Sequence, residues 1–385
     1  MEENKKNKIP NVPNLRFSDD TWKIAKIGDV LTIERGGSPR PIQNFVTRRP
    51  DGINWIKIGD TSDDGYIYSA KEKIIPEGVK HSRKVKAGDL LLSNSMSFGK
   101  PYILKINGCI HDGWLVIRDM DNKFSKEFLR NYLGSSFCIS QYKKLAAGGV
   151  VTNLNKDLVC SAIIKYPPMT SQEKIASFLC ALDERIRTQN KIIEELQSLR
   201  KAIYYEQIKG AKKEEMMISD ICDIGRGRVI SQQEIAKQNN PIYPVFSSQT
   251  LNNGIMGYLD NYDFDGEYVT WTTDGANAGT VFYHNGKFNC TNVCGTLKTN
   301  SEKVIPYYLF LALSHEAKRY VSTNLGNPKL MNGTMAKIKI KVPSIVVQKT
   351  VVNGSMILDR LIDIETKILN ALSSQKSYFL ANLFI

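Results

Sequence analysis

A long amphipathic segment occurs twice in this chain, and the repeat constrains the fold more than any other feature. SQEKIASFLCALDERI, residues 171–186, aligns without gaps with VQKTVVNGSMILDRLI, residues 347–362, which begins 176 positions later. Both copies have a Gln near the start and a Leu-Asp pair further along. Internal similarity of this kind indicates a structural unit that is built more than once. The chain is therefore predicted to contain two similar units.

The similarity continues upstream of the two helical segments. KYPPMTSQEK (165–174) matches KVPSIVVQKT (341–350) at the same offset, and each copy is a short apolar strand that ends at a proline. KIGDVLTIERG (26–36) aligns with MISDICDIGRG (217–227) at an offset of 191. The change of offset indicates loops of different length between equivalent strands. The repeat thus includes a whole domain and the helix that follows it.

The two helical segments have the residue spacing of a coiled coil. Apolar residues recur at alternating steps of four and three over about 36 residues, or roughly 54 Å of helix. One helix alone would expose this apolar stripe to water, so the two helices are predicted to pack on each other. The alternative is that each helix lies on its own domain. The predicted interface consists of Ile175, Leu179, Leu182, Ile186, Ile193, Leu196, Ile203, Val351, Leu358, Ile362, Leu369, Leu372 and Phe379.

Polar residues interrupt both apolar seams at equivalent places. They are Gln189 and Arg200 in the first helix and Glu365 and Lys376 in the second. Matching breaks are expected of two partners in one coil. The first helix carries the chain into the second domain, so an antiparallel second helix would return it towards the first. This connectivity predicts a domain at each end of a rod and a pseudo-twofold axis, which suits duplex DNA as a ligand.

The predicted fold class is mixed α/β. Outside the helices, short strand-like runs alternate with turns rich in Gly, Asn, Asp and Ser. We expect a tandem duplication of an α/β domain plus a long helix, with the two helices packed as an antiparallel coiled coil with pseudo-twofold symmetry. The predicted boundaries are 1–168 for the first domain, 169–211 for the first helix, 212–344 for the second domain and 345–385 for the second helix.

The charge of the chain favours a polyanionic partner. The 385 residues carry a formal net charge of +13, and residues 1–170 hold 27 Lys and Arg against 18 Asp and Glu. Residues 171–385 hold 25 against 21, so the first segment is the more basic one. The seven cysteines lack the spacing of a metal site, and no apolar run is long enough to cross a membrane. The start lacks the apolar core of a signal peptide, which predicts a cytoplasmic protein.

One frame occurs twice behind a strand-rich segment: Pro-x4-Gln-x9-Leu-Asp, in YPPMTSQEKIASFLCALDERI and in VPSIVVQKTVVNGSMILDRLI. PNLRF with Trp22, KIGDV, GINWIKIGD, GDLLLSNSMSFGK and IHDGWLVIR precede the first copy. Through these motifs the chain resembles, along its whole length, the specificity subunits of type I restriction-modification enzymes. The second copy departs from the pattern, because VQKTVVNG stands where the first copy has SQEKIASF.

The resemblance implies a non-catalytic subunit that recognises DNA. It implies two target recognition domains, each reading one half of a bipartite site in double-stranded DNA, at a separation fixed by the helical pair. It also implies that the helices dock two copies of an adenine DNA methyltransferase subunit, and that restriction and translocase subunits join through the complex. Cleavage, ATP hydrolysis and methyl transfer would belong to these partners, and no cofactor is expected in this chain.

The residues agree with a chain that lacks a catalytic centre of its own. RGGSPRP at 35–41 is not the Gly-x4-Gly-Lys-Ser/Thr loop that binds nucleotide phosphates. KYPPM has paired prolines without the preceding Asn or Asp of an amino-methyltransferase. Three alternatives stay open: a fused nuclease-methyltransferase, a scaffold that binds only proteins, and the specificity portion of another restriction-modification class.

Candidate DNA contacts lie in glycine turns and polar tracts of both domains. Phosphates are bound by Lys, Arg, Ser and Thr, whereas bases are read by Arg, Lys, Asn, Gln, Ser and Thr. The candidates in the first domain are Arg35, Ser38, Arg40, Lys57, Asn94, Ser95, Ser97 and Lys100. Those in the second domain are Arg226, Arg228, Ser231, Ser247, Ser248, Gln249, Thr272, Thr273, Asp274 and Asn277.

Overall fold

In the computed structural model the chain forms two compact units. The structure describes residues 21–94, 99–146, 154–249, 254–322 and 326–384. Unit 1 contains the described residues up to Ile192 together with those from Glu365 on, and unit 2 is Ile193–Ile364. Within the described ranges, no helix is long and apolar enough to cross a membrane.

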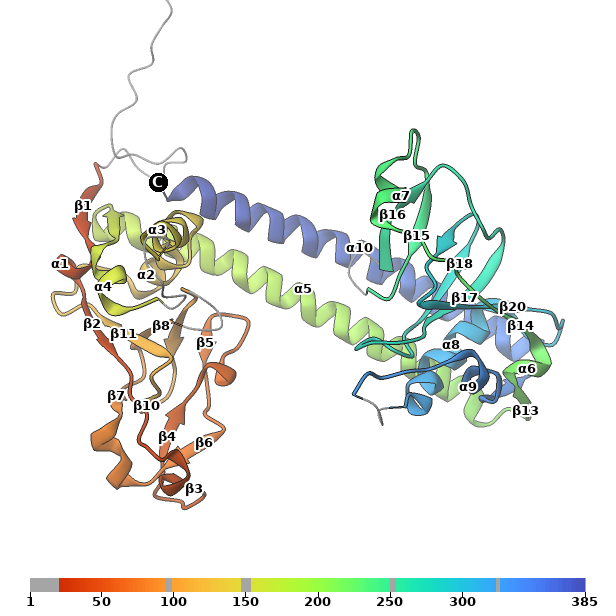
Figure 1. The fold of residues 1–385 in the computed structure, drawn as a ribbon, viewed down its shortest axis with the longest axis horizontal. Helices are drawn as coiled ribbons and strands as arrows, with labels where there is room; N and C mark the ends of the chain where they lie inside the picture. Colours follow the sequence, from red (N-terminus) through yellow and green to blue (C-terminus); the bar gives the residue numbers. More distant parts are fainter. Residues whose placement is uncertain (1–20, 95–98, 147–153, 250–253, 323–325, 385) are drawn as a thin grey trace, which may run out of the picture. The chain divides into compact units, whose positions relative to one another are not determined.

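Unit 1 contains two five-stranded sheets (Figure 1). Their strand orders are β2-β11-β8-β9-β5 and β3-β6-β4-β10-β7, and β1 pairs with β12 in a separate antiparallel ribbon. The strands are β1 Lys23–Lys26, β2 Thr32–Arg35, β3 Val46–Thr47, β4 Ile53–Ile56, β5 Tyr66–Ile67, β6 Glu72–Ile74, β7 Arg83–Val85, β8 Leu90–Ser93, β9 Pro101–Leu104, β10 Gly108–Ile110, β11 Trp114–Arg118 and β12 Ile163–Tyr166. The helices are α1 Ile27–Val30, η1 Ile42–Asn44, η2 Ile58–Asp60, η3 Pro76–His81, α2 Lys126–Leu133, α3 Ser136–Ala146 and α4 Lys156–Ser161.

The core of unit 1 lies on both faces of the β8–β11 sheet. Alternate residues of a strand point to opposite faces, so Leu90 and Leu92 pack with the helices while Leu91 packs towards the second sheet. Trp114 begins β11 and is fully buried in the core between the sheets. This alternation explains why GDLLLSN reads as a continuous apolar run, because both faces of β8 are covered.

Unit 2 repeats this plan with fewer strands. Its sheets have the orders β14-β20-β17-β18 and β16-β15-β19, and β13 pairs with β21 as β1 pairs with β12. The strands are β13 Lys213–Met217, β14 Cys222–Arg226, β15 Tyr243–Phe246, β16 Ile255–Leu259, β17 Glu267–Thr272, β18 Val281–Asn285, β19 Asn289–Cys290, β20 Cys294–Thr299 and β21 Lys339–Pro343. The helices are α6 Ile218–Ile221, α7 Gln232–Ala236, α8 Pro306–Glu316, η5 Ala317–Tyr320 and α9 Asn332–Ala336. The predicted tandem duplication is confirmed.

The long helices are α5, Met169–Lys209, and α10, Ile345–Leu383, and they pack together. In unit 1 the start of α5 meets the end of α10, where the Phe178 and Phe379 rings lie 4.7 Å apart. In unit 2 the end of α5 meets the start of α10, where Gly354 lies against Ile203. All thirteen apolar residues predicted for the interface are buried or half-buried. The alternative in which each helix lies only on its own domain is therefore wrong.

The polar residues of the seam form contacts between the helices. In unit 1, Gln189 donates hydrogen bonds to the backbone carbonyl and the carboxylate of Glu365, its equivalent residue 176 positions later. Lys376 pairs with Asp183 in unit 1, and Arg200 pairs with Asp359 in unit 2. The two ion pairs are equivalent at the same offset, so the repeat extends to the electrostatics of the seam.

The end of each long helix completes the core of the unit that it reaches. Leu383, the last residue of α10, and Phe384 after it are buried in unit 1, and the Phe384 ring lies 5.7 Å from Phe128 and 5.2 Å from Tyr132. In unit 2, Tyr204 and Ile208 from the last turns of α5 are likewise buried in the core. Each α/β domain is thus covered by the start of one long helix and the end of the other.

A buried glutamine fastens the start of each long helix to its domain. Gln172 accepts a hydrogen bond from the backbone N–H of Ser125 at 3.0 Å and donates to the carbonyls of Lys123 at 3.1 Å and Pro167 at 3.0 Å. Gln348 does the same in unit 2, with Ile305 N–H at 2.9 Å and the carbonyls of Lys303 at 2.7 Å and Pro343 at 2.9 Å. These equivalent contacts explain why the repeated segment keeps its Gln.

Gln172→Ala should lower the free energy of unfolding of the chain by on the order of 3 kcal/mol, because three backbone groups lose their hydrogen bonds to the Gln172 amide. Gln197→Ala is the control, since Gln197 is exposed on α5 and its replacement should change stability by less than about 0.5 kcal/mol. Denaturant unfolding measures both variants. Equal stabilities of the two variants would contradict the structural role of Gln172.

Candidate DNA interface and its junction with the helix pair

The candidate DNA contacts of unit 1 begin at a tight turn after β2. Gly36 donates to the carbonyl of Trp114 at 2.9 Å, and Gly37 donates to that of Ile110 at 3.0 Å. A Cβ atom on Gly36 would lie 2.0 Å from the carbonyl oxygen of His111, so only glycine fits. The turn is therefore held against residues 111–113, which form a second turn between β10 and β11.

Four of the predicted residues converge on Asp112 in this second turn. Ser38 Oγ lies 2.8 Å and Arg40 Nη2 3.4 Å from the Asp112 carboxylate. The backbone carbonyl of Asp112 accepts hydrogen bonds from Asn94 at 2.9 Å and from Arg35 at 3.2 Å. The hydrogen bond from Ser38 holds the pKa of Asp112 below its ordinary value. Sequence reasoning missed Asp112, whose only signal was its place in IHDGWLVIR.

The remaining candidates of unit 1 lie outside this cluster. Lys57 forms an ion pair with Glu72, and its ammonium lies 5.7 Å from the Trp55 ring. Lys100 is exposed, with its ammonium 5.3 Å from the Tyr102 ring. Ser95 and Ser97 lie outside the described residues. Among the candidates of unit 1, Arg35, Arg40 and Lys100 are exposed cations, and Arg40 is paired with Asp112.

Unit 2 has the same arrangement, in which the turn after β14 is held against the turn between β19 and β20. We call this pair of turns the joint. Gly227 donates to the carbonyl of Cys294 at 3.1 Å, and a Cβ atom on Gly227 would lie 2.2 Å from the carbonyl oxygen of Cys290. Arg226 donates to the carbonyl of Asn292, as Arg35 does to that of Asp112, and also to Thr273 Oγ1 at 3.1 Å. The Arg-Gly sequence seen in both repeats therefore closes the same turn in both units.

Several candidates of unit 2 already have partners within the domain. Arg228 pairs with Glu234 at 2.7 Å and with Asp263 at 3.0 Å. Ser231 is the N-cap of α7 and accepts a hydrogen bond from the Glu234 N–H at 3.1 Å. Arg226 is exposed and keeps its charge free of a carboxylate among the described residues. The free positive charge of this joint is therefore carried by Arg226 rather than by Arg228.

The polar tract after β17 is mostly engaged with its own domain. Thr272 and Thr273 are buried at 1% and 0% exposure, so their hydroxyls do not reach the surface. Asn277 donates to the carbonyl of Ser248 at 3.0 Å, and Gln249 donates to that of Ile255. The other three candidates, Ser247, Ser248 and Asp274, are half-buried.

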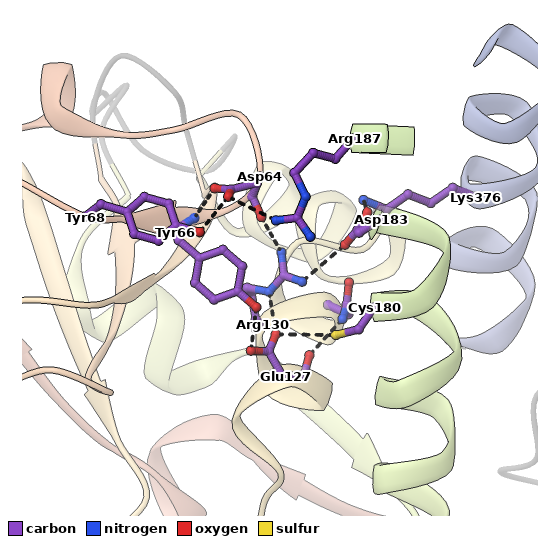
Figure 2. Close-up of polar contacts among 10 residues, drawn as sticks. Asp64, Tyr66, Tyr68, Glu127, Arg130, Cys180, Asp183, Arg187 and Lys376 are labelled. Carbon is purple, nitrogen blue, oxygen red and sulfur yellow. Dashed lines mark hydrogen bonds and ion pairs between the residues drawn. The ribbon is translucent and has the colours of Figure 1, made fainter. Parts of the chain in front are cut away.

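A buried arginine joins the first domain to the long helices (Figure 2). Arg130 of α2 is 7% exposed and donates to Glu127 at 3.0 Å, to Asp183 of α5 at 3.2 Å and to the carbonyl of Asp64 at 3.3 Å. Its guanidinium lies 5.2 Å from the Tyr66 ring in β5. A buried charge of this kind is tolerated because each of the three guanidinium nitrogens has a hydrogen-bond partner, and two of these partners are carboxylates.

Further contacts extend this network to both long helices. Lys376 of α10 pairs with Asp183, and Arg187 of α5 lies 3.8 Å from Asp64. Tyr68 donates to Asp64 at 2.7 Å. In unit 2, Asp359 takes the place of Asp183 and is bound by Arg200 of α5 and Tyr307 of α8. The Asp of each Leu-Asp pair thus binds both its domain and the opposite helix.

Comparisons with known proteins found a matching family model and similar sequences. A family model described as "Type I restriction modification DNA specificity domain" matches residues 19–198 and again 211–374. A candidate type I specificity subunit of Mycoplasma pneumoniae is 39% identical over 191 residues, which are 49% of this chain and 79% of the relative. The specificity subunit of the MpnII type I restriction enzyme from the same organism is 40% identical over 149 residues, 38% of this chain and 44% of the relative.

Solved structures share the fold at low sequence identity. The crystal structure of a type I restriction-modification system S subunit from M. genitalium aligns with a TM-score of 0.63 at 16% identity, over 97% of this chain and 99% of that one. A chain from a structural study of complex assembly and conformational transition in the type I restriction-modification system aligns with a TM-score of 0.54, over 95% of this chain and 98% of that one.

Ser38→Ala should raise the pKa of Asp112 towards its ordinary value, because the hydrogen bond from Ser38 is the largest cause of the lowered pKa. A carboxyl group with a lowered folded-state pKa stabilises the fold above its unfolded-state pKa, and this contribution is lost as pH falls. Carboxyl-detected NMR titration measures the shift. Ser140→Ala is the control, since the Ser140 hydroxyl donates to the carbonyl of Phe137 in its own helix. An unchanged Asp112 pKa in Ser38→Ala would contradict the account.

Proposed function

Because the chain belongs to the family of type I restriction-modification DNA specificity domains and carries that domain twice, we propose that it reads a bipartite site in duplex DNA. Each α/β domain reads one half of the site. The two halves of the site are separated by a spacer of fixed length. One observation supports this proposal most. Arg35 and Arg226 occupy the same place in the two domains, and each donates to a backbone carbonyl of the facing turn.

The chemistry of the joint supports a role in DNA contact. Arg35 and Arg226 are exposed and have no carboxylate partner among the described residues, and guanidinium groups bind phosphates or the acceptor edge of guanine. The hydrogen-bonded turns that carry these arginines fix the positions of their backbone atoms. Side chains that are buried, capping or paired, such as Thr273, Ser231 and Arg228, are less suited to direct contact and support the turns instead.

The proposed partners rest on the family of the chain and on its repeated helical segments. We propose that this chain is a non-catalytic subunit whose helix pair docks two adenine methyltransferase subunits, with restriction and translocase subunits joining through them. The support is that the helical segments repeat at a constant offset whereas the domains diverge, as expected when identical partners must dock twice. A scaffold that binds only proteins is the second candidate, and the more basic first segment argues against it.

Methylation mapping tests the proposed function. Cells that express this chain with its cognate methyltransferase should methylate a motif of two specific parts separated by one fixed, unspecified spacer. Expression of the methyltransferase without this chain is the control and should leave that motif unmethylated. A continuous motif, or methylation that does not depend on this chain, would contradict the proposal.

Arg35→Ala and Arg226→Ala form a matched pair of variants, because the two residues occupy equivalent places in the two domains. Arg35→Ala should relax or weaken recognition of one half of the motif, and Arg226→Ala should affect the other half. Loss of one good contact costs about 1–3 kcal/mol, or roughly 5- to 150-fold in affinity for that half. The same mapping measures both. If either variant alters both halves equally, the modular assignment is wrong.

A further inference from the structure

A basic groove runs beside β7 in unit 1, next to the candidate DNA interface. Its volume is about 700 Å³, and its walls come from β2, η3, β7 and β11. We call it the β7 groove, and the side chains that matter for its chemistry are Glu34, Lys80, Ser82, Arg83, Lys84 and Arg118. The contacts inside the groove show which charges remain available to a ligand.

The β7 groove has more positive charge than its own carboxylates neutralise. Glu34 is shared by Arg118 at 2.6 Å and Arg83 at 3.0 Å, and Asp89 binds Arg118 at 3.1 Å. Lys80 and Lys84 are exposed and have no ion pair within the described part of the chain. Two lysine ammonium groups are therefore free to bind an anion, while the arginines are held in place by Glu34.

The groove is continuous with the turn that carries the candidate DNA contacts. Arg83 Nε donates to the backbone carbonyl of Arg35 at 3.4 Å, and Ser82 Oγ donates to that of Ile110 at 2.9 Å. A Cβ atom on Gly37 would lie 2.7 Å from the carbonyl oxygen of His81. A polyanion that contacts Arg35 therefore meets the cations of the groove within the same unit.

Unit 2 has the opposite charge at the equivalent place. In unit 1, Val85 of β7 pairs with Gly108 of β10. The corresponding bridge in unit 2 joins Phe264 to Phe288, and Asp263 and Asp265 flank Phe264 where Lys84 and Lys86 flank Val85. Asp263 moreover neutralises Arg228. The β7 groove is thus a property of the first domain, in line with the larger basic surplus of residues 1–170.

We propose that the β7 groove binds the phosphate backbone of duplex DNA beside the half-site of the first domain, with Lys80 and Lys84 as direct phosphate contacts. The inference rests on the proposed function and adds that the two domains contribute unequally to the affinity for DNA. Lysine contacts to phosphate carry no sequence information, so the groove supplies affinity rather than specificity. The first domain therefore supplies more of the salt-dependent affinity than the second.

The test is the salt dependence of DNA binding by the full chain. Fluorescence anisotropy with a random-sequence duplex is measured for the unaltered chain and for Lys80→Gln/Lys84→Gln. The slope of log K against log salt should become shallower by about 1.8, or 0.9 for each lost phosphate contact. Lys143→Gln/Lys144→Gln on α3 is the matched control, because it removes the same charge from exposed lysines of the same unit.

The outcomes separate the groove from the proposed function. A shallower slope in the Lys80/Lys84 variant but not in the control supports the groove, and Lys84→Gln alone should then give half the change. An equal slope in both double variants overturns the groove and leaves the proposed function intact. Absence of salt-dependent binding by the unaltered chain overturns both. Methylation mapping adds an independent readout, since the recognised motif should be the same in the Lys80/Lys84 variant.

Discussion

The buried amide of Gln172, repeated as Gln348, is the contact on which the rest of the architecture depends. Each amide satisfies one N–H and two carbonyl groups where a domain meets the start of a long helix. Because all three partners are backbone groups, the surrounding side chains can diverge while this attachment of the helix to its domain stays constant. Two domains that share little sequence can therefore be fastened to the helix pair in the same way, which leaves their recognition surfaces free to differ.

The charged contacts at the junction are equivalent in position but different in chemistry. Asp183 binds Arg130 and Lys376, whereas Asp359 binds Tyr307 and Arg200. In both units the carboxylate is shared between the domain and the opposite long helix, so neither helix can shift without disturbing its domain. The same requirement is met by a cation in one unit and by a phenol in the other. The two units therefore make the same connection with different residue types.

The helix pair could be predicted from the sequence because its signal is periodic, and every predicted apolar position, from Ile175 to Phe379, is buried or half-buried. The site could be predicted only in part. The Arg35 and Ser38 turn was visible as a glycine-rich repeat, but its partner Asp112 lies 74 residues from Ser38 and has no local pattern. Residue type favours Thr273 as a DNA contact although packing buries it, and favours Ser231 although it caps a helix. Residue type alone cannot separate a surface contact from a structural one.

The central claim is that two similar domains on one helix pair contact DNA at two places. Hydroxyl-radical footprinting of the full chain, bound with its methyltransferase to a duplex that carries the mapped motif, tests it most directly. Two protected tracts are expected, one at each half of the motif, with an accessible spacer of constant length between them. A single continuous tract over one half, with the other half as reactive as free DNA, would contradict the account.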